Sequence, residues 1–383
     1  MAKYWVGWTW NWSDDTNHWA TTSGGAPWAW NLPTATDDVI FDTLSNATAY
    51  TCTIDATTKL CRDITFWAPL AWNMTWAWSV AMTISGSMTL YAGLIRTYTG
   101  ALTFNATSTG KTITMNGVSL SGNVTFNWVW WGWILQDTFT WSSNTIPITA
   151  WTFDSNNQAI SSWANFNSTW SWVRTITLWS STIQVSQWFN FSTTTNLTFN
   201  SNTSTFSITW WWATLNPWWL TFYNISKVTG SGFDDSLSFG WDCTVGGTIT
   251  LTWFSATRYR LLVKSNTKWT ARTITAAAIS VDKVDFQDIT GAGAATWDMS
   301  AAAWYTGDCW GNSMKALGAA AFTTAATCNW SAGTTWSTAT WSNHSIPLPQ
   351  DTATFTTAWT VTITQDMPRI GSVDFSTVAL NGW

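Results

Sequence analysis

The stretch Leu102-Thr103-Phe104-Asn105 decides the fold expected of this chain, because close variants of it recur along the sequence. In each copy apolar residues alternate with threonine, and alternate residues of a β-strand point to opposite faces. Phe104 and Phe126 lie 22 residues apart, and Phe199 and Phe222 lie 23 residues apart. A strand that buries one apolar row every ~20–25 residues is typical of the stacked rungs of a β-solenoid. The recurrences are Val124-Thr125-Phe126-Asn127, Leu197-Thr198-Phe199-Asn200 and Leu220-Thr221-Phe222.

Other segments show the same two-residue period, among them Lys111–Met115 and Thr248–Thr252. Their aliphatic residues share one face and their threonines share the other, so each rung can bury its aliphatic row while outward threonines align into ladders. We therefore expect an all-β protein built as a parallel β-solenoid. Tandem β-sandwiches are the alternative, since they also contain many short strands with regular turns. The solenoid is favoured because the strand motif itself recurs, and not only the strand spacing.

The two ends of the chain resemble one another. Asn11-Trp12-Ser13 recurs at residues 329–331, and the segment Asp37–Phe41 parallels Asp351–Phe355. The interval from Thr53 to Phe66 equals the interval from Thr362 to Phe375. We expect four regions: an N-terminal Trp- and Gly-rich β module at 1–50, a repetitive β-solenoid at 51–290, an Ala- and Gly-rich connector at 291–327, and the start of a second copy of the N-terminal module at 328–383.

Tryptophan occupies 38 of 383 positions, and many lie where turns call for glycine. Runs such as Trp210-Trp211-Trp212 and Pro217-Trp218-Trp219 have turn-forming neighbours, and tight turns need residues that accept a positive φ. Our hypothesis is that about thirty tryptophans are UGA codons read as glycine, as in some uncultivated bacterial lineages and their phages, which would bring glycine to a share usual for turn-rich proteins. The alternative is a truly Trp-rich, sugar-stacking protein. Six tryptophans are interpreted as genuine: Trp5, Trp12, Trp19, Trp297, Trp330 and Trp336.

Charge and composition narrow the function classes. Charged residues make up 9% of the chain, all 20 acidic residues are Asp, and the net charge is −5 with a pI near 4.8. A nucleic-acid partner is not expected, because such proteins need clustered Lys and Arg. No window approaches the ~18–20 apolar residues of a membrane span. The segment Met1–Gly7 lacks the apolar core of a secretion signal, so we expect a virion protein or a surface protein exported by another route.

The five cysteines do not have the spacing of a zinc site or of a disulfide scaffold. Cys52 and Cys61 could face one another across a short hairpin, and Cys309 could pair with Cys328. Buried free thiols are the favoured interpretation, because virion proteins fold in a reducing cytoplasm.

The opening of the chain carries a recognisable motif: Tyr4-Trp5-Val6-Gly7-Trp8, Asn11-Trp12-Ser13, His18-Trp19, and Pro33 followed by Asp37-Asp38-Val39-Ile40-Phe41-Asp42. It resembles a group of phage-encoded and environmental β-repeat surface proteins, which continue with Leu-Thr-Phe-Asn rungs as this chain does. Trp8, Trp10, Trp28 and Trp30 fall where that group has glycine. The resemblance implies a β-repeat architecture and a virion or cell-surface role. It brings no active site with it.

Few residues suggest chemistry. His18 and Trp19 could belong to a small-ligand site, although a packed structural histidine is the favoured alternative. Asp37 and Asp38 are a candidate calcium pair, and no cofactor other than calcium is expected. Turn-capping is the favoured role for such aspartates, because neighbouring strand residues point to opposite faces.

Solenoid enzymes that cut polysaccharides place carboxylates in an outer groove. Asp282, Asp285 and Asp288 are the candidate cluster, with Asp282 and Asp288 expected on one face of a single strand and Asp285 on the other. Solvated strand-end residues are the favoured reading of all three.

From these observations we expect a non-enzymatic structural or adhesive protein of a phage virion or cell surface, such as a fibre, spike or appendage component. A glycan-binding or glycan-cleaving β-helix of the tail-depolymerase type is the alternative. Self-association into a homotrimer or larger assembly is the expected mode of partnership, and a host-surface glycan is the expected ligand class.

Overall fold

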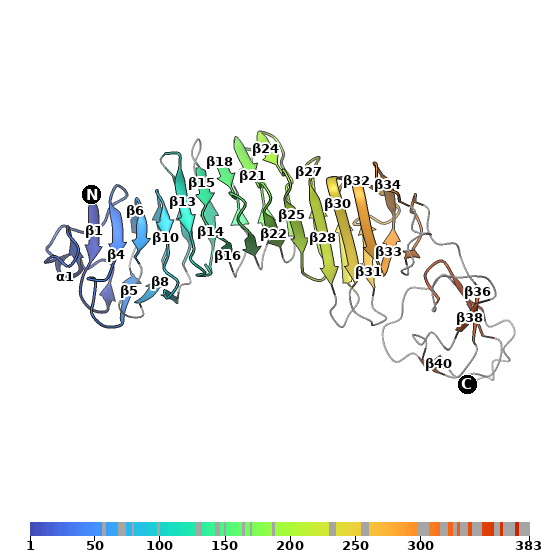
Figure 1. Ribbon diagram of the computed structural model, residues 1–383, viewed down its shortest axis with the longest axis horizontal. Coiled ribbons are helices and arrows are strands. Elements are labelled where there is room, and N and C mark those ends of the chain that lie inside the picture. The colour runs from blue at the N-terminus through green and yellow to red at the C-terminus, as the bar shows by residue number, and fades with distance from the viewer. Residues whose placement is uncertain are drawn as a thin grey trace. The chain divides into compact units, whose positions relative to one another are not determined.

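The computed structural model is a β-solenoid of about 10 turns, with 52% of residues in strands and 1% in helix. It confirms the expected all-β class. The chain divides into two compact units, Met1–Thr205 and Phe206–Trp383. Figure 1 labels the strands that form them. The structure describes residues 1–55, 59–67, 74–78, 80–97, 100–106, 108–126, 132–141, 146–148, 151–162, 165–168, 171–185, 188–229, 235–253, 260–297, 306–314, 321–324, 328–329, 336–338, 347–355, 361–362 and 372–374.

The described residues of unit 1 form one short helix and a series of short strands. Its elements are β1 (Ala2–Trp5), β2 (Trp10–Asn11), α1 (Asp15–His18), β3 (Trp19–Ala20), β4 (Asp38–Phe41), β5 (Tyr50–Ile54), β6 (Lys59–Cys61), β7 (Ile64–Phe66), β8 (Met74–Trp78), β9 (Met82–Ile84), β10 (Met88–Thr89), β11 (Ile95–Arg96), β12 (Leu102–Phe104), β13 (Lys111–Thr114), β14 (Val124–Phe126), β15 (Gly132–Leu135), β16 (Phe139–Trp141), β17 (Ile146–Pro147), β18 (Trp151–Asp154), β19 (Ile160–Ser162), β20 (Phe166–Asn167), β21 (Arg174–Thr177), β22 (Thr182–Val185), β23 (Trp188–Asn190) and β24 (Leu197–Asn200).

These strands stack into parallel sheets, one strand from each coil. The largest sheet has ten strands in the order β24-β21-β18-β15-β13-β10-β7-β4-β1-β3, and two four-stranded sheets have the orders β11-β8-β5-β2 and β14-β12-β9-β6. Further parallel pairs join β16 to β19 and β19 to β22, and likewise β17 to β20 and β20 to β23. Parallel stacking of successive coils rules out the alternative of tandem β-sandwiches, whose strands pair antiparallel.

The core of unit 1 is built from the recurrent apolar rows. Phe104 of β12 lies in register with Ile84 of β9 and Phe126 of β14. The rings of Phe104 and Phe126 stack with centroids 5.1 Å apart. Leu102 and Phe104 of β12 are buried, whereas Thr103 between them is half-buried. The alternation seen in the sequence therefore marks the inward and outward faces of a rung.

One part of the spacing argument was wrong. Phe199 lies on β24 in the ten-stranded sheet, whereas Phe222 lies on β27, which pairs with β30 in another sheet. Their 23-residue separation is therefore not the repeat of one sheet position. Rungs differ in length at their corners, so equal separations in sequence identify equivalent positions only where the register agrees, as at Phe104 and Phe126.

Unit 2 continues the same type of architecture with longer strands. Its elements are β25 (Thr205–Ile208), β26 (Ala213–Asn216), β27 (Thr221–Phe222), β28 (Asn224–Thr229), β29 (Asp235–Phe239), β30 (Cys243–Trp253), β31 (Leu261–Ser265), β32 (Arg272–Asp282), β33 (Val284–Gln287), β34 (Ile289–Ala292), β35 (Gly307–Asp308), β36 (Ala321–Thr324), β37 (Cys328–Asn329), β38 (Trp336–Thr338), β39 (Thr352–Thr354), β40 (Val361–Thr362) and β41 (Ser372–Asp374). Strands β28, β30, β32 and β34 form one parallel series, and β26, β29, β31, β33 and β35 form another.

The last strands of unit 2 repeat the pairing pattern of the first strands of unit 1. Strand β1 pairs antiparallel with β3 and parallel with β4, and β36 pairs antiparallel with β38 and parallel with β39. The register also agrees, because Asn11 pairs with Thr53 and Asn329 pairs with Thr362. Strand β36 (Ala321–Thr324) has the position in this pairing pattern that β1 has in unit 1, and it precedes the segment 328–383.

The same capped turn opens β4 and β39. The backbone N–H of Thr34 donates to Asp37 Oδ2 at 3.0 Å, and the N–H of Leu348 donates to Asp351 Oδ2 at 2.7 Å. In each case the aspartate side chain accepts a hydrogen bond from the backbone N–H three residues earlier. This hydrogen bond closes the turn. The two copies are thus alike in local hydrogen bonding as well as in strand order.

The favoured interpretation of buried free thiols is confirmed, whereas the alternative of a hairpin that joins Cys52 and Cys61 is wrong. Cys52 lies on β5 and Cys61 on β6, and these strands belong to different sheets. Both side chains are free thiols in the solenoid interior, as is Cys243. Burial raises the pKa of all three thiols, so they are unreactive at neutral pH. The side chain of Cys328 lies outside the described part of the chain.

Two structural groups stand out among the described tryptophans. Trp5, Trp12, Trp19 and Trp297 are buried, and so are four that the sequence had not singled out: Trp76, Trp133, Trp141 and Trp253. A second group has positive φ: Trp30, Trp179, Trp212, Trp218, Trp219, Trp269 and Trp310. These are 7 of the 14 described non-glycine residues with positive φ. Bulky side chains rarely adopt this conformation, whereas glycine adopts it freely. Trp330 and the side chain of Trp336 lie outside the described residues.

Candidate functional site

The His18–Trp19 pair is part of the aromatic core of the N-terminal module. His18 ends the four-residue helix α1, which Asp14 caps by accepting from the N–H of Asn17. The His18 ring stacks on Trp5 with centroids 4.6 Å apart, and its Nδ1 lies 2.8 Å from the carbonyl oxygen of Val6. Trp19 donates its Nε1–H to the Trp12 carbonyl at 2.8 Å. Both side chains are buried, so neither is presented to a ligand.

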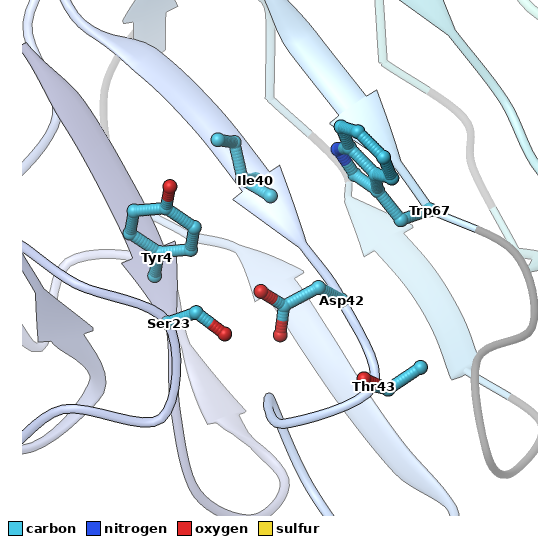
Figure 2. Close-up of a pocket in the computed structure, with 6 residues that line it drawn as sticks. All are labelled: Tyr4, Ser23, Ile40, Asp42, Thr43 and Trp67. Atoms are coloured by element: carbon cyan, nitrogen blue, oxygen red, sulfur yellow. The ribbon is translucent and has the colours of Figure 1, made fainter.

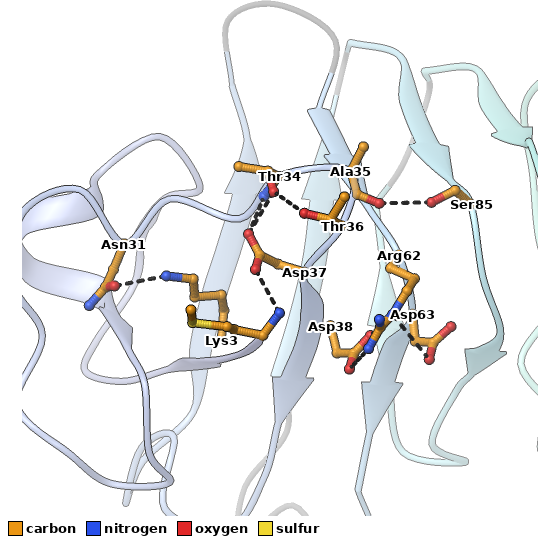
Figure 3. Close-up of polar contacts among 11 residues, drawn as sticks. Lys3, Asn31, Thr34, Ala35, Thr36, Asp37, Asp38, Arg62, Asp63 and Ser85 are labelled. Atoms are coloured by element: carbon orange, nitrogen blue, oxygen red, sulfur yellow. Dashed lines mark hydrogen bonds and ion pairs between the residues drawn. The ribbon is translucent and has the colours of Figure 1, made fainter. Parts of the chain in front are cut away.

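Asp37 and Asp38 face different partners (Figure 3). Asp37 accepts from the N–H and hydroxyl of Thr34 and from the N-terminal amine, while Asp38 pairs with the guanidinium of Arg62. Burial raises the pKa of Asp37, but the Thr34 hydrogen bonds and the amine together bring it below its ordinary value. The two carboxylates act as a turn cap and an ion-pair partner rather than as one chelating pair.

The expected arrangement of Asp282, Asp285 and Asp288 on a single strand was wrong. Lys283 and Asp288 have φ near 55°, in the left-handed region, and each turns a corner. Asp282 therefore ends β32, and Asp285 lies on β33 in a different sheet. Asp288 caps a turn by accepting from the N–H of Trp269 at 3.1 Å.

Asp285 lies inside the solenoid. Its Oδ1 accepts from Nε of Arg260 at 2.6 Å, and both side chains are almost fully buried. A carboxylate held by a buried guanidinium has no access to a polysaccharide in an outer groove. The cluster proposed from the sequence therefore does not form a surface site.

A second buried ion pair joins Lys227 of β28 to Asp235 of β29. Nζ of Lys227 lies 2.7 Å from Oδ2 of Asp235, and both side chains are fully buried. The other carboxylate oxygen accepts from the N–H groups of Trp212 and Ser236. Burial lowers the pKa of Lys227, and the Asp235 carboxylate opposes that shift. The two charges compensate each other in the interior, and their full burial keeps them away from ligands in solvent.

A pocket of about 390 Å³ lies on the outer face of the ten-stranded sheet near its β1 end (Figure 2). Its lining comes from separate segments that the parallel register brings together: Tyr4, Ser23, Ile40, Asp42, Thr43 and Trp67. Tyr4 pairs with Ile40, and Ile40 pairs with Thr65, so outward positions of three adjacent strands form its floor. The volume is at the small end of the range usual for ligand pockets.

Backbone hydrogen bonds hold the lining in place. Asp42 Oδ1 accepts from the N–H of Leu44 at 3.0 Å, and the N–H of Asp42 donates to Ser45 Oγ at 2.9 Å. The Ser45 carbonyl in turn accepts from the N–H of Gly7 at 2.7 Å, which ties this turn to the end of β1. The N–H of Trp67 donates to the Phe41 carbonyl at 2.8 Å and fixes the start of the segment after β7.

Gly24 allows the loop that carries Ser23 to approach this turn. Its φ is +63°, and a Cβ there would lie 3.1 Å from Cβ of Leu44. A larger residue would meet both the backbone strain and the contact with Leu44, so glycine is required at this position. The loop and the turn after β4 thus form one wall of the pocket.

The sequence did not identify this pocket. Tyr4 and Asp42 belong to the opening motif, but nothing in the motif gave them a role. Ser23, Thr43 and Trp67 are unremarkable in sequence, because they become neighbours only when successive coils stack. The sequence contained only part of the signal for this pocket. Tyr4 lies at an outward position of one strand, and Asp42 directly follows the adjacent strand.

Metal binding has little support in the described geometry. Among the described residues no three His, Cys, Asp or Glu side chains are grouped so that they could hold a metal ion.

No helix in the described part of the chain is long and apolar enough to cross a membrane. The chain matches no protein-family model, no curated protein and no solved structure.

Proposed function

We propose that this chain is a non-enzymatic structural and adhesive protein of a phage virion or cell surface. The observation that carries the proposal is the stacked solenoid itself, in which apolar rows fill the interior and outward strand positions carry short polar residues such as Thr83, Thr103 and Thr125. A repetitive parallel stack offers a regular outer surface for contact with a target. The resemblance of the opening motif to phage-encoded and environmental surface proteins supports the virion or cell-surface setting.

Glycan cleavage is less well supported than adhesion. Glycosidases use two carboxyl groups on opposite sides of the scissile bond. The described lining of the pocket contains one carboxylate, Asp42, and the candidate Asp285 is held in a buried ion pair. This geometry favours binding over turnover.

Adhesion is tested with the full chain on cells. Labelled protein is incubated with intact bacterial cells or their isolated surface polysaccharide, and bound protein is quantified along with new reducing or unsaturated ends. Saturable retention without new chain ends is the expected result. Release of new ends would assign an enzyme, and the absence of retention on any surface tested would remove the adhesive role.

A further inference from the structure

The pocket presents polar atoms that the protein itself leaves without partners. Asp42 uses Oδ1 to cap its own turn, and no described residue donates to its Oδ2. Among the described residues, no hydrogen bond engages the hydroxyls of Tyr4, Ser23 and Thr43 or the indole N–H of Trp67. Figure 2 shows the Asp42 carboxylate directed toward Ser23 and Tyr4. These groups are thus available to a ligand that offers several hydroxyls.

Apolar surface accompanies these polar groups. Trp67 is more than half exposed, and Tyr4 and Ile40 form the floor beside it. Aromatic rings with a few directed hydrogen-bonding groups suit a flat ligand that is apolar on its faces and polar at its edge. A pyranose ring has C–H groups on its faces and hydroxyls around its edge.

The negative charge of the pocket favours neutral ligands over anionic ones. Asp42 is the only charged residue among the described residues of the lining, which include no Lys, Arg or His to balance it. An anionic ligand such as a uronate, sulfate or phosphate would meet a carboxylate with no cation. A neutral sugar would instead donate its hydroxyls to Oδ2, and hydrogen bonds to a charged acceptor are the stronger kind.

From this geometry we infer that the pocket formed by Tyr4, Ser23, Ile40, Asp42, Thr43 and Trp67 binds a neutral pyranose unit of a surface glycan. Asp42 accepts from sugar hydroxyls, Ser23 and Thr43 complete the hydrogen bonding, and the Tyr4 and Trp67 rings contact the sugar. The inference rests on the proposed adhesive function and names its ligand class. Trp67 is not among the tryptophans with positive φ, so the backbone places no demand for glycine at this wall.

The direct test measures binding of defined oligosaccharides by isothermal titration calorimetry on the full chain. The probes are neutral tetrasaccharides of glucose and of N-acetylglucosamine, with a galacturonate tetrasaccharide as the anionic comparison. We expect a neutral probe to bind and the galacturonate to bind at least about tenfold more weakly. Binding of the galacturonate alone, or of no neutral probe, would overturn the assignment.

The key variant is Asp42→Asn. The amide keeps Oδ1 as the acceptor for the Leu44 N–H, so the turn is retained, but the free Oδ2 becomes an N–H₂ donor. We expect at least about a tenfold loss of affinity for the neutral probe, because a charged acceptor is lost. Trp67→Ala provides a second variant that should weaken binding by removing the ring.

Asp154→Asn is the matched control, because Asp154 Oδ1 also caps a turn by accepting from the N–H two residues later, at 2.7 Å from Asn156. Asp154 is not part of the pocket lining, so the Asp154→Asn variant should bind the neutral probe with the affinity of the wild type. Equal affinity in Asp42→Asn and wild type would refute the pocket. If the wild type and Asp42→Asn adhere to cells equally well, the pocket assignment is refuted but the adhesive function stands. If the wild type does not adhere to cells at all, the proposed function is refuted.

Discussion

At the residue scale, backbone conformation separates two kinds of tryptophan. Trp219 has a φ of 69° and is 80% exposed, whereas Trp133 is 1% exposed and donates its Nε1–H to the Gly86 carbonyl. A left-handed conformation costs a bulky residue about 1–2 kcal/mol. We propose that glycine is the natural residue at the positive-φ positions, through UGA codons read as glycine. Mass spectrometry of the natural protein decides this: a peptide covering residues 209–220 with intact tryptophans would contradict it.

The first prediction concerns these two positions. Trp219→Gly should stabilise the protein by about 1 kcal/mol, because the strain is relieved and only part of the gain is offset by the greater freedom of glycine in the unfolded chain. Trp133→Gly, its matched opposite, should destabilise by at least about 3–5 kcal/mol, because it empties a filled interior. Chemical denaturation measures both. A loss of stability in Trp219→Gly would show that the exposed indole contributes more than its backbone costs.

The second prediction concerns pH and Asp37. The pKa of this carboxyl is lowered in the folded protein, so the group contributes stability above the unfolded-state pKa, and this contribution is lost as the pH falls through the folded-state value. The urea midpoint of the wild type should therefore drop as the pH is lowered below about 4. In Asp37→Asn this part of the drop should be absent. An unchanged pH profile in the variant would mean that other carboxylates carry the acid sensitivity.

At the scale of single elements, strand alternation was predictable and corners were not. The segment 282–288 reads as one strand, but left-handed conformations at Lys283 and Asp288 divide it between two sheets. Neither Lys nor Asp signals a corner as clearly as glycine does. The sequence also did not reveal which charged residues point into the interior. Lys227 appears in the sequence as an ordinary strand residue, and its partner Asp235 lies on the next strand.

The third prediction tests this buried pair. Lys227→Met should destabilise by about 3–5 kcal/mol, because it leaves the Asp235 carboxylate buried without a cation. In the double variant Lys227→Met with Asp235→Asn, the amide oxygen still accepts from the Trp212 and Ser236 N–H groups and no charge remains. Most of the lost stability should return. Thermal denaturation of the set measures this, and a double variant as unstable as the single one would show that the ion pair itself is required.

At the scale of the whole molecule, the parallel solenoid was predictable from the sequence because it depends on local patterns. The apolar alternation sets the faces of each rung, and the Asn11 and Asn329 segments keep the same strand partners. The pocket could not be predicted, because Tyr4, Asp42 and Trp67 meet only through the register of stacked coils. The register between stacked coils depends on residues far apart in the sequence. The local alternation of apolar and polar residues therefore predicts the strands more directly than it predicts their register.

The fourth prediction follows from nearest-neighbour stacking. In a solenoid each rung is stabilised by the rungs beside it, so damage should remain local. Phe104→Ala should destabilise its surroundings by about 3–5 kcal/mol, because Phe104 fills the interior between Ile84 and Phe126. Hydrogen exchange should then rise in β9, β12 and β14, while β30 and β32 of unit 2 keep wild-type protection. Thr103→Ala, at the outward position of the same strand, should change exchange little. A uniform rise across both units would instead show that the chain unfolds as one cooperative body, and that stacking interactions extend well beyond adjacent coils.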